Sequence, residues 1–261
     1  MSGRNILFYD QVTVRYRGRT EPAAYKLTLP VPEKAVTAIV GESGSGKSTL
    51  LRLAMGLLPT GGEQAEGRVL FNGEEISTFS KKRLREIRGG EMAMVFQDPG
   101  ACFDPRRKLG MQFVESYKAH RAGGKREALD AAGEILSGLG FSDPGDLFRR
   151  YSFELSGGQL QRAALGMAMM MKPKLLLCDE PTSALDPVVQ AEVAGYLKDL
   201  HQKAGTALLL VTHNLGLAAA LGDYIAVMEK GHLIEYGPTE QIIHSPQEGY
   251  TKRLIESVWE V

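Results

Sequence analysis

A glycine-rich segment near the start of the chain constrains the fold more than any other feature. Residues 41–49 read GESGSGKST and directly follow the short apolar run Val36–Val40. Glycines at these positions allow a tight turn whose backbone N–H groups point inward, and Lys47 opens a helical pattern. A buried strand that turns directly into a helix is typical of α/β folds, and the start of such a helix favours an anionic ligand.

The same segment matches the P-loop pattern, which predicts a nucleoside triphosphate as the ligand. Lys47 would place a positive charge on the phosphates, and the Ser48 hydroxyl would coordinate Mg²⁺. A glycine-rich turn without a ligand is the alternative, but the strand before the turn and the helix after it favour the P-loop. The predicted ATP-binding residues of this segment are Gly41, Glu42, Ser43, Gly44, Ser45, Gly46, Lys47, Ser48 and Thr49.

An apolar run that ends in two carboxylates supplies groups that suit a nucleoside triphosphate bound with Mg²⁺. Residues 175–180 read LLLCDE, which predicts a buried strand with Asp179 and Glu180 at its carboxyl end. Asp179 can hold Mg²⁺ beside Ser48, and Glu180 is then placed to polarise an attacking water. A solvated acidic pair is the ordinary alternative, and the upstream P-loop favours the catalytic interpretation.

A second glycine-containing motif also stands before a helical pattern. Residues 155–159 read LSGGQ, and Ser156 with the two glycines resembles a second anion cradle at a helix N-terminus. One triphosphate rarely needs two such cradles from one chain. The motif therefore hints at a site that is shared between two subunits.

The order of apolar patterns predicts an α/β fold, a P-loop ATPase core, within one domain over residues 1–261. Alternating runs near the N-terminus predict an antiparallel β subdomain, and short buried runs separated by helices predict a mainly parallel sheet. A polar helical stretch is predicted to be an inserted helical subdomain over about residues 98–165, and a short helical tail is expected over about 239–261. Nearer the P-loop, we expect a helix from Lys47 to about Leu58 and a loop over 59–66.

Composition and termini favour a cytoplasmic protein. The net charge is +0, with 43% hydrophobic and 24% charged residues, so no basic excess is available for bulk binding of nucleic acid. The two cysteines, Cys102 and Cys178, cannot build a disulfide framework and suit a reducing compartment. The N-terminus lacks the apolar core of a secretion signal. No uncharged apolar run approaches about 18 residues, so we expect any membrane role to depend on a partner.

The motifs occur together in an order that resembles one family. The P-loop, LSGGQ and LLLCDE follow one another along the chain, with Gln97 between the first two and His213 after the last. This arrangement resembles the nucleotide-binding subunit of ATP-binding-cassette transporters, over about residues 6–255. The resemblance implies the fold described above and hydrolysis of ATP with Mg²⁺ as cofactor.

The resemblance also implies roles for residues that would be unremarkable alone. Tyr16 is similar to the aromatic residue that stacks on adenine, and Gln97 resembles the loop glutamine that touches Mg²⁺ and senses a transmembrane partner. His213 matches the switch histidine that contacts the γ-phosphate. Residues implied at a dimer interface are Leu155, Ser156, Gly157, Gly158 and Gln159, which close on ATP held by the opposite subunit, and Ser183, Ala184, Leu185 and Asp186, which cross the interface.

Finer features resemble the ATPases of dipeptide, oligopeptide and nickel importers. They are the loop 60–67, the pair FQDP (96–99) and FDPR (103–106), and the tail 245–255. The group implies a second, related ATPase subunit in a heterodimer, with a homodimer as the runner-up. It further implies two integral membrane permeases, an indirect link to an extracytoplasmic solute-binding protein, and a peripheral position on the cytoplasmic face of the membrane. No cysteine follows Cys178, so no iron–sulfur site is expected.

Two other functional classes stay open on the sequence alone. An accessory ATPase of a soluble metabolic complex would carry much the same motifs. ATPases of nucleic-acid repair or translation usually contain a long coiled coil or two fused cassettes, and this chain shows neither. The leading prediction is an ATPase that drives a membrane importer of the peptide, nickel or metal-chelate class by ATP-driven dimer closure, without binding nucleic acid.

Overall fold

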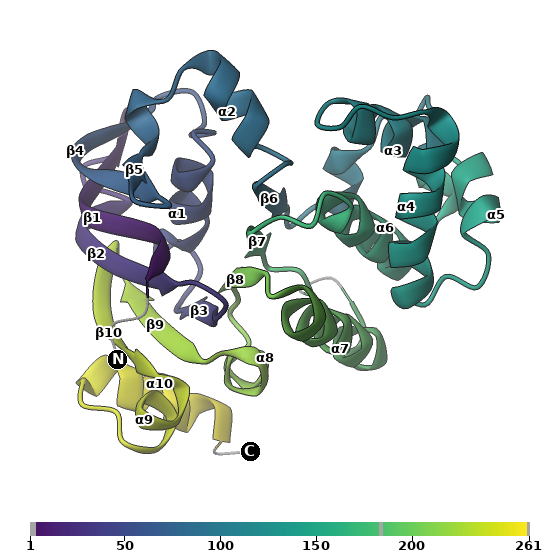
Figure 1. The fold of residues 1–261 in the computed structure, drawn as a ribbon. Coiled ribbons are helices and arrows are strands. Elements are labelled where there is room, and N and C mark those ends of the chain that lie inside the picture. The colour runs from purple at the N-terminus through teal and green to yellow at the C-terminus, as the bar shows by residue number, and fades with distance from the viewer. Residues whose placement is uncertain (1–3, 183–184, 260–261) are drawn as a thin grey trace.

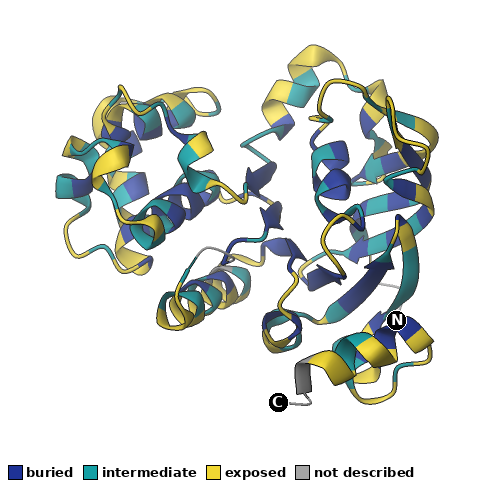
Figure 2. Ribbon diagram, turned by 180° about the vertical axis from the view of Figure 1, so that it is seen from behind, coloured by how far each residue is buried: buried dark blue, intermediate teal, exposed yellow. Residues whose placement is uncertain are grey.

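A computed structural model describes residues 4–182 and 185–259, and a six-stranded sheet lies at its centre (Figure 1). The strand order is β10-β9-β3-β8-β7-β6, and all neighbours pair in parallel except β9 and β10. Its strands are β3 (Val36–Val40), β6 (Met92–Val95), β7 (Leu175–Asp179), β8 (Ala207–Val211), β9 (Tyr224–Glu229) and β10 (His232–Pro238). Every residue of β3, β6, β7 and β8 is buried, as the dark blue arrows of Figure 2 show. Cover on both faces explains why these strands read as continuous apolar runs.

A second, antiparallel sheet is formed mainly by the N-terminal part of the chain. Its order is β2-β1-β4-β5, with β1 (Asn5–Tyr16), β2 (Ala24–Pro32), β4 (Gly62–Phe71) and β5 (Glu74–Glu75). The loop expected over 59–66 is wrong for most of its length, because β4 already begins at Gly62 and pairs with β1 as far as Tyr16. This segment is polar and reads as a loop, but it forms a strand whose backbone hydrogen-bond partners lie far away in the sequence.

Helices cover the sheets on several sides. They are α1 (Lys47–Ala54), α2 (Lys81–Ile87), α7 (Pro187–Ala204), α8 (Leu215–Leu221), α9 (Thr239–His244) and α10 (Gly249–Trp259), with the short η1 (Ile76–Thr78). The first helix ends earlier than the expected Leu58, since Gly56 adopts a left-handed φ of 59° just after it. The helices α9 and α10 form the C-terminal part, beside β9 and β10 (Figure 1).

A separate group of helices lies to one side of the sheet, between β6 and β7 in the sequence (Figure 1). It contains η2 (Pro99–Cys102), α3 (Leu109–Lys118), α4 (Lys125–Gly138), α5 (Pro144–Arg149), η3 (Ser152–Glu154) and α6 (Gly157–Met169). It has its own apolar core, which includes Phe113, Leu136 and Leu147. The proposed boundary near residue 165 falls inside α6, which packs both on α4 and on β6.

The fold class predicted from the sequence is confirmed, with its mainly parallel sheet, N-terminal antiparallel sheet and helical group. Within the part of the chain that the structure describes, no helix combines the length and apolar character needed to cross a membrane.

Candidate active site

The parallel strands bring the predicted site residues to one edge of the sheet. The P-loop follows β3, Gln97 follows β6, Glu180 follows β7 and His213 follows β8. Because these strands run in the same direction, the segments after their carboxyl ends meet at the same edge, which is where ligands bind in open α/β sheets. Side chains from four distant parts of the sequence are therefore neighbours.

Two glycines of the P-loop are required by close backbone contacts. A Cβ atom on Gly41, which has a φ of 145°, would lie 2.0 Å from the Met228 carbonyl oxygen. A Cβ atom on Gly46, with a φ of 100°, would lie 1.9 Å from the Ala23 carbonyl oxygen. Both contacts are with backbone and cannot relax as a side chain would, so these positions accept no side chain. The P-loop backbone is therefore in close contact with both β9 and the turn before β2.

The lysine of the P-loop is held inside the loop itself. Lys47 is buried, and its Nζ donates hydrogen bonds to the carbonyl oxygens of Gly41 and Glu42, both at 2.7 Å. Burial lowers the pKa of Lys47, and the nearby carboxylates of Glu180 and Asp179 act in the opposite direction. The side chain therefore holds a desolvated cation inside the P-loop.

The carboxylate at the end of β7 fits a divalent cation. The Ser48 hydroxyl donates a hydrogen bond to Asp179 Oδ1 at 2.6 Å. The other oxygen, Oδ2, is buried and accepts no hydrogen bond from the described residues, and the nearest cation, Arg52 Nη2, is 4.0 Å away. Burial accordingly raises the pKa of Asp179. Hydroxyl and carboxylate oxygens are ligands that Mg²⁺ prefers, so Ser48 and Asp179 match its chemistry.

Glu180 occupies a strained backbone position between two other predicted site residues. Its φ is 47°, which is unusual for a residue with a side chain, and its N–H donates to the Val211 carbonyl oxygen at 2.9 Å. Its Oε2 lies 3.4 Å from Gln97 Nε2 and 3.3 Å from His213 Nδ1. Strain of this kind persists where the surroundings fix the geometry, and it is common at functional sites. The structure thus brings Gln97, Glu180 and His213 together.

A pocket of about 180 Å³ lies over the P-loop at this edge. Its lining residues are Arg19, Ala23, Ser43, Gly44, Gly46, Lys47, Ser48, Thr49, Gln97 and Glu180. The predicted residues Gly41, Glu42 and Ser45 belong to the loop but not to the lining of this pocket. Two lining residues, Arg19 and Ala23, were missed by the sequence analysis. The only signal for Arg19 is its place three residues after Tyr16.

Tyr16 lies next to the P-loop helix. Its hydroxyl is 3.3 Å from Thr49 Oγ1, and the guanidinium carbon of Arg19 is 5.8 Å from the centre of its ring. The ring is partly exposed at the end of β1, in the wall of an adjoining pocket. This position is compatible with a base stacking on the ring, so the predicted role of Tyr16 stays a proposal.

The LSGGQ segment lies outside the P-loop pocket, since none of its residues is in the pocket lining. Ser156 caps α6: its hydroxyl accepts the Gln159 N–H at 3.3 Å, and Gln159 Oε1 accepts the Ser156 N–H at 3.1 Å. Leu155 is partly buried, and a Cβ atom on Gly158 would contact Val189 of α7. Ser156 and Gly157 are exposed. Within one chain, therefore, the segment forms a capped helix start outside the pocket over this P-loop.

The predicted dimer loop is described in part. Ser183 and Ala184 lie outside the described residues. Leu185 is partly buried against the core beneath α7, and the carboxylate of Asp186 accepts hydrogen bonds from the N–H groups of Val188 and Val189, both at 3.1 Å. Asp186 is the N-cap of α7, a role that fits its position directly before Pro187.

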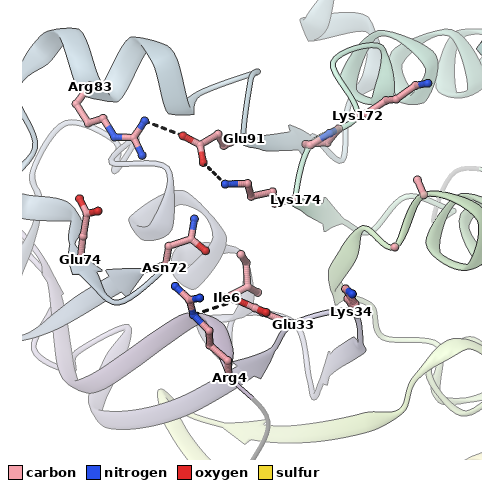
Figure 3. A pocket seen from close by; sticks show the side chains of 13 residues that line it. Arg4, Ile6, Glu33, Lys34, Asn72, Glu74, Arg83, Glu91, Lys172 and Lys174 are labelled. Atoms are coloured by element: carbon pink, nitrogen blue, oxygen red, sulfur yellow. Dashed lines mark hydrogen bonds and ion pairs between the residues drawn. The ribbon is translucent and has the colours of Figure 1, made fainter.

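A larger pocket, about 530 Å³, lies at the opposite edge of the sheet, among the segments that precede β3, β6, β7 and β8. Many of its charges are paired with one another (Figure 3). Glu91 accepts hydrogen bonds from Arg83 at 2.7 Å and from Lys174 at 2.8 Å, and Arg4 pairs with Glu33 at 3.3 Å. This pocket contains none of the predicted site residues, and its size alone does not make it the active site.

Comparisons with known proteins agree with the site. The model of the ABC transporter family matches residues 25–183. The dipeptide transport ATP-binding protein DppD of Escherichia coli strain K12 is 37% identical over 97% of this chain and 78% of its own length. The oligopeptide transport ATP-binding protein AmiE of Streptococcus pneumoniae serotype 4 is 35% identical over 97% of this chain and 72% of its own length.

Solved structures give the same result. CbiO1 of Clostridium perfringens, part of the ABC transporter complex CbiONQ, aligns with a TM-score of 0.78 and 26% identity over 98% of this chain and 96% of its own. The ATP-binding cassette MJ0796, solved as a dimer bound to ADP and phosphate, aligns with a TM-score of 0.79 and 26% identity over 89% and 98% of the two chains.

The fold and the site define a P-loop ATPase, and the comparisons identify its family. The chain belongs to the ABC transporter family, and it is an ATP-binding, ATP-hydrolysing cassette of that family. The resemblance read from the order of the motifs is confirmed.

Proposed function

We propose that this chain is the ATP-hydrolysing subunit of a membrane importer for short peptides, on the cytoplasmic face of the membrane. The names of two relatives support peptides as the solute, because both are transport proteins for dipeptides or oligopeptides and align over 97% of this chain. They also favour transport over the soluble metabolic complex and the nucleic-acid or translation machinery. Nickel or a metal chelate is the second solute class, and it rests on the resemblance of residues 60–67 and 245–255 to that importer group.

The main support for this proposal is that the ATP site within one chain is incomplete. The pocket over the P-loop contains Lys47, Gln97 and Glu180, but no residue of the LSGGQ segment, whose Ser156 and Gly157 are exposed on the helical group. An exposed helix start with two glycines suits the phosphates of a nucleotide that is bound to another subunit. ATP would therefore join two cassettes face to face, and hydrolysis would release them.

The residues at the edge of the sheet would divide the reaction among them. The P-loop backbone and Lys47 would bind the phosphates, and Ser48 with Asp179 would hold Mg²⁺. A bound Mg²⁺ would neutralise charge that develops on the phosphate oxygens. Glu180 acts as the general base toward a water, while Gln97 and His213, which both contact its carboxylate, orient it.

The connection to a membrane partner would run through Gln97. This residue stands between β6 and η2, at the point where the chain leaves the sheet and enters the helical group. Rotation of that group upon dimer closure would therefore move the segment around Gln97 and push on a permease helix bound there. We propose two permeases and a second, related ATPase subunit in a heterodimer, with a solute-binding protein acting from outside. Nucleic acid has no part in this cycle.

Purification from membranes tests the proposal. We expect the chain to co-purify with two permeases and a second ATPase, and the reconstituted complex in nanodiscs to hydrolyse ATP faster when a peptide-loaded solute-binding protein is added. Chelating Mg²⁺ with EDTA should stop turnover. Recovery of two copies of this chain with the permeases would indicate a homodimer instead of a heterodimer. Stimulation by a nickel-loaded binding protein would indicate nickel instead of peptides as the solute. Recovery with a soluble complex and never with membrane would refute import while leaving the ATPase intact.

A further inference from the structure

A tyrosine of the C-terminal helix contacts the P-loop. The Tyr250 hydroxyl oxygen accepts a hydrogen bond from the Glu42 backbone N–H at 3.3 Å, across 208 positions of sequence. Tyr250 lies in the first turn of α10, and Glu42 is the second residue of the P-loop. Figure 1 shows α10 packed in the C-terminal part of the molecule, far along the chain from the segment that it contacts.

Tyr250 is firmly held in this position. Its side chain is buried in a cluster that includes Val40 of β3, Leu215 of α8 and Ile242 of α9. Burial raises the pKa of Tyr250, so the phenol is a neutral hydroxyl at physiological pH. A buried, neutral hydroxyl in a fixed place is a suitable acceptor for one backbone N–H group.

A carboxylate on β10 fixes the start of α10. Glu235 accepts the backbone N–H of Gln247 at 2.9 Å through Oε1 and that of Glu248 at 3.2 Å through Oε2. Hydrogen bonds to a carboxylate are stronger than those between neutral groups. They anchor the segment directly before α10, and so determine where Tyr250 enters the core.

The Gly41–Glu42 peptide is important because its other polar group, the Gly41 carbonyl, accepts a hydrogen bond from Lys47 Nζ at 2.7 Å. The Glu42 carbonyl oxygen accepts one of the two short hydrogen bonds from Lys47 Nζ. In the planar Gly41–Glu42 peptide the N–H is bound to Tyr250 and the C=O to Lys47, so the hydroxyl of α10 and the ammonium of the P-loop act on one rigid unit. A change at the hydroxyl would therefore alter the direction of the carbonyl that orients Lys47.

We infer that Tyr250 is a positioning residue of the ATP site, which fixes the Gly41–Glu42 peptide and through it the Lys47 ammonium. The inference rests on the assignment of the P-loop as the ATP site and is independent of the solute and of the membrane partners. On this inference, the C-terminal helix contributes directly to the affinity for ATP.

The test compares three conservative substitutions in the full chain, with nucleotide binding measured by a fluorescent ATP analogue and turnover by phosphate release. Tyr250→Phe keeps the ring and removes the hydroxyl, and it should raise the dissociation constant and the KM for ATP roughly 2- to 10-fold, the scale of one net hydrogen bond. The kcat should change less than about twofold, because the hydroxyl contacts no reacting atom. Glu235→Gln keeps the Tyr250 hydroxyl but weakens the hydrogen bonds that fix the start of α10. It should therefore also raise the dissociation constant for ATP, by a smaller factor.

Tyr236→Phe is the matched control. Tyr236 of β10 is half-buried and stacks on Tyr224 at 5.7 Å, and among the described residues its hydroxyl donates to or accepts from none of the P-loop. It should leave ATP affinity unchanged. Wild-type affinity in Tyr250→Phe would overturn the inference, and so would an equal loss in Tyr236→Phe, which would indicate general loosening of the C-terminal part. If the wild-type chain itself bound no ATP, or Lys47→Ala bound it normally, the P-loop assignment would fail instead.

Discussion

The two edges of the central sheet carry two pockets of opposite construction. At the carboxyl edge, residues of the P-loop line much of the pocket, and Lys47 as a whole residue is only 5% exposed. At the amino edge, long charged side chains project into a larger pocket, and the Lys174 side chain is 59% exposed (Figure 3). Both pockets contain lysines and carboxylates, so composition alone does not separate them.

The difference lies in what satisfies the charges. At the carboxyl edge Asp179 keeps a buried oxygen without a hydrogen bond from the described residues, and burial lowers the pKa of Lys47. At the amino edge Glu91 has two cationic partners, and although burial acts to raise its pKa, the hydrogen bonds from Lys174 and Arg83 lower it. Desolvated charges without full partners are suited to a ligand, whereas paired and solvated charges stabilise the fold.

Removal of one lysine from each pocket gives the strongest contrast. We expect Lys47→Ala to lower the kcat/KM for ATP by about 1000-fold, because the phosphates lose their buried cation. Lys174→Ala, the matched control at the amino edge, should leave ATP turnover within about twofold. Phosphate release at 25 °C measures both. Wild-type turnover in Lys47→Ala would disprove the P-loop assignment, and equal losses in both variants would abolish the distinction between the two pockets.

The glutamates differ in the same way. Glu180→Gln should still bind ATP but hydrolyse it at least about 100-fold more slowly, because an amide is a poor general base. We expect the variant to accumulate as an ATP-bound dimer, visible by size-exclusion chromatography with ATP and Mg²⁺. If the rate stays unchanged, Glu180 is not the base, and His213, which lies 3.3 Å from it, is the next candidate.

The carboxyl edge could be predicted from sequence because its chemistry is local. Residues 41–49 specify a turn between a strand and a helix, and Asp179 and Glu180 directly follow an apolar strand. Parallel pairing then brings these segments together without any further information. The ordered motifs also singled out Gln97 and His213, which the structure brings beside Glu180, although neither residue carries a signal of its own.

What the sequence did not predict depends on contacts between distant residues. The strand β4 begins in a polar segment that resembles a loop, and its pairing with β1 supplies the missing hydrogen bonds. Arg19 enters the pocket from an exposed turn, and the hydrogen bond from Glu42 to Tyr250 joins the second residue of the P-loop to the last helix. No periodicity or local motif marks such pairs, because the partner of each residue is determined by the fold.

The smallest expected effect comes from the amino edge and concerns stability. Glu91→Gln retains the shape of the side chain but removes its charge beside Arg83 and Lys174, and it should lower the free energy of unfolding at pH 7 by about 1 kcal/mol. The melting temperature should fall by roughly 2–4 °C, with ATP turnover at 25 °C unchanged. Glu74→Gln is the control, since Glu74 lines the same pocket and no ion pair joins it to the described residues.

The pH dependence of that loss separates charge pairing from a change in packing. The pKa of Glu91 is lowered from its ordinary value of 4.5, so the folded state favours the carboxylate. Its contribution is complete above that ordinary value and is lost as the pH falls through the lowered pKa of the folded protein. The difference between wild type and Glu91→Gln, measured by urea unfolding, should therefore be full at pH 7 and decline toward zero as the pH falls below about 4.5. A difference that persists unchanged at low pH would mean that packing is the cause, and a loss of ATP turnover at pH 7 would show that the amino edge is coupled to the active site.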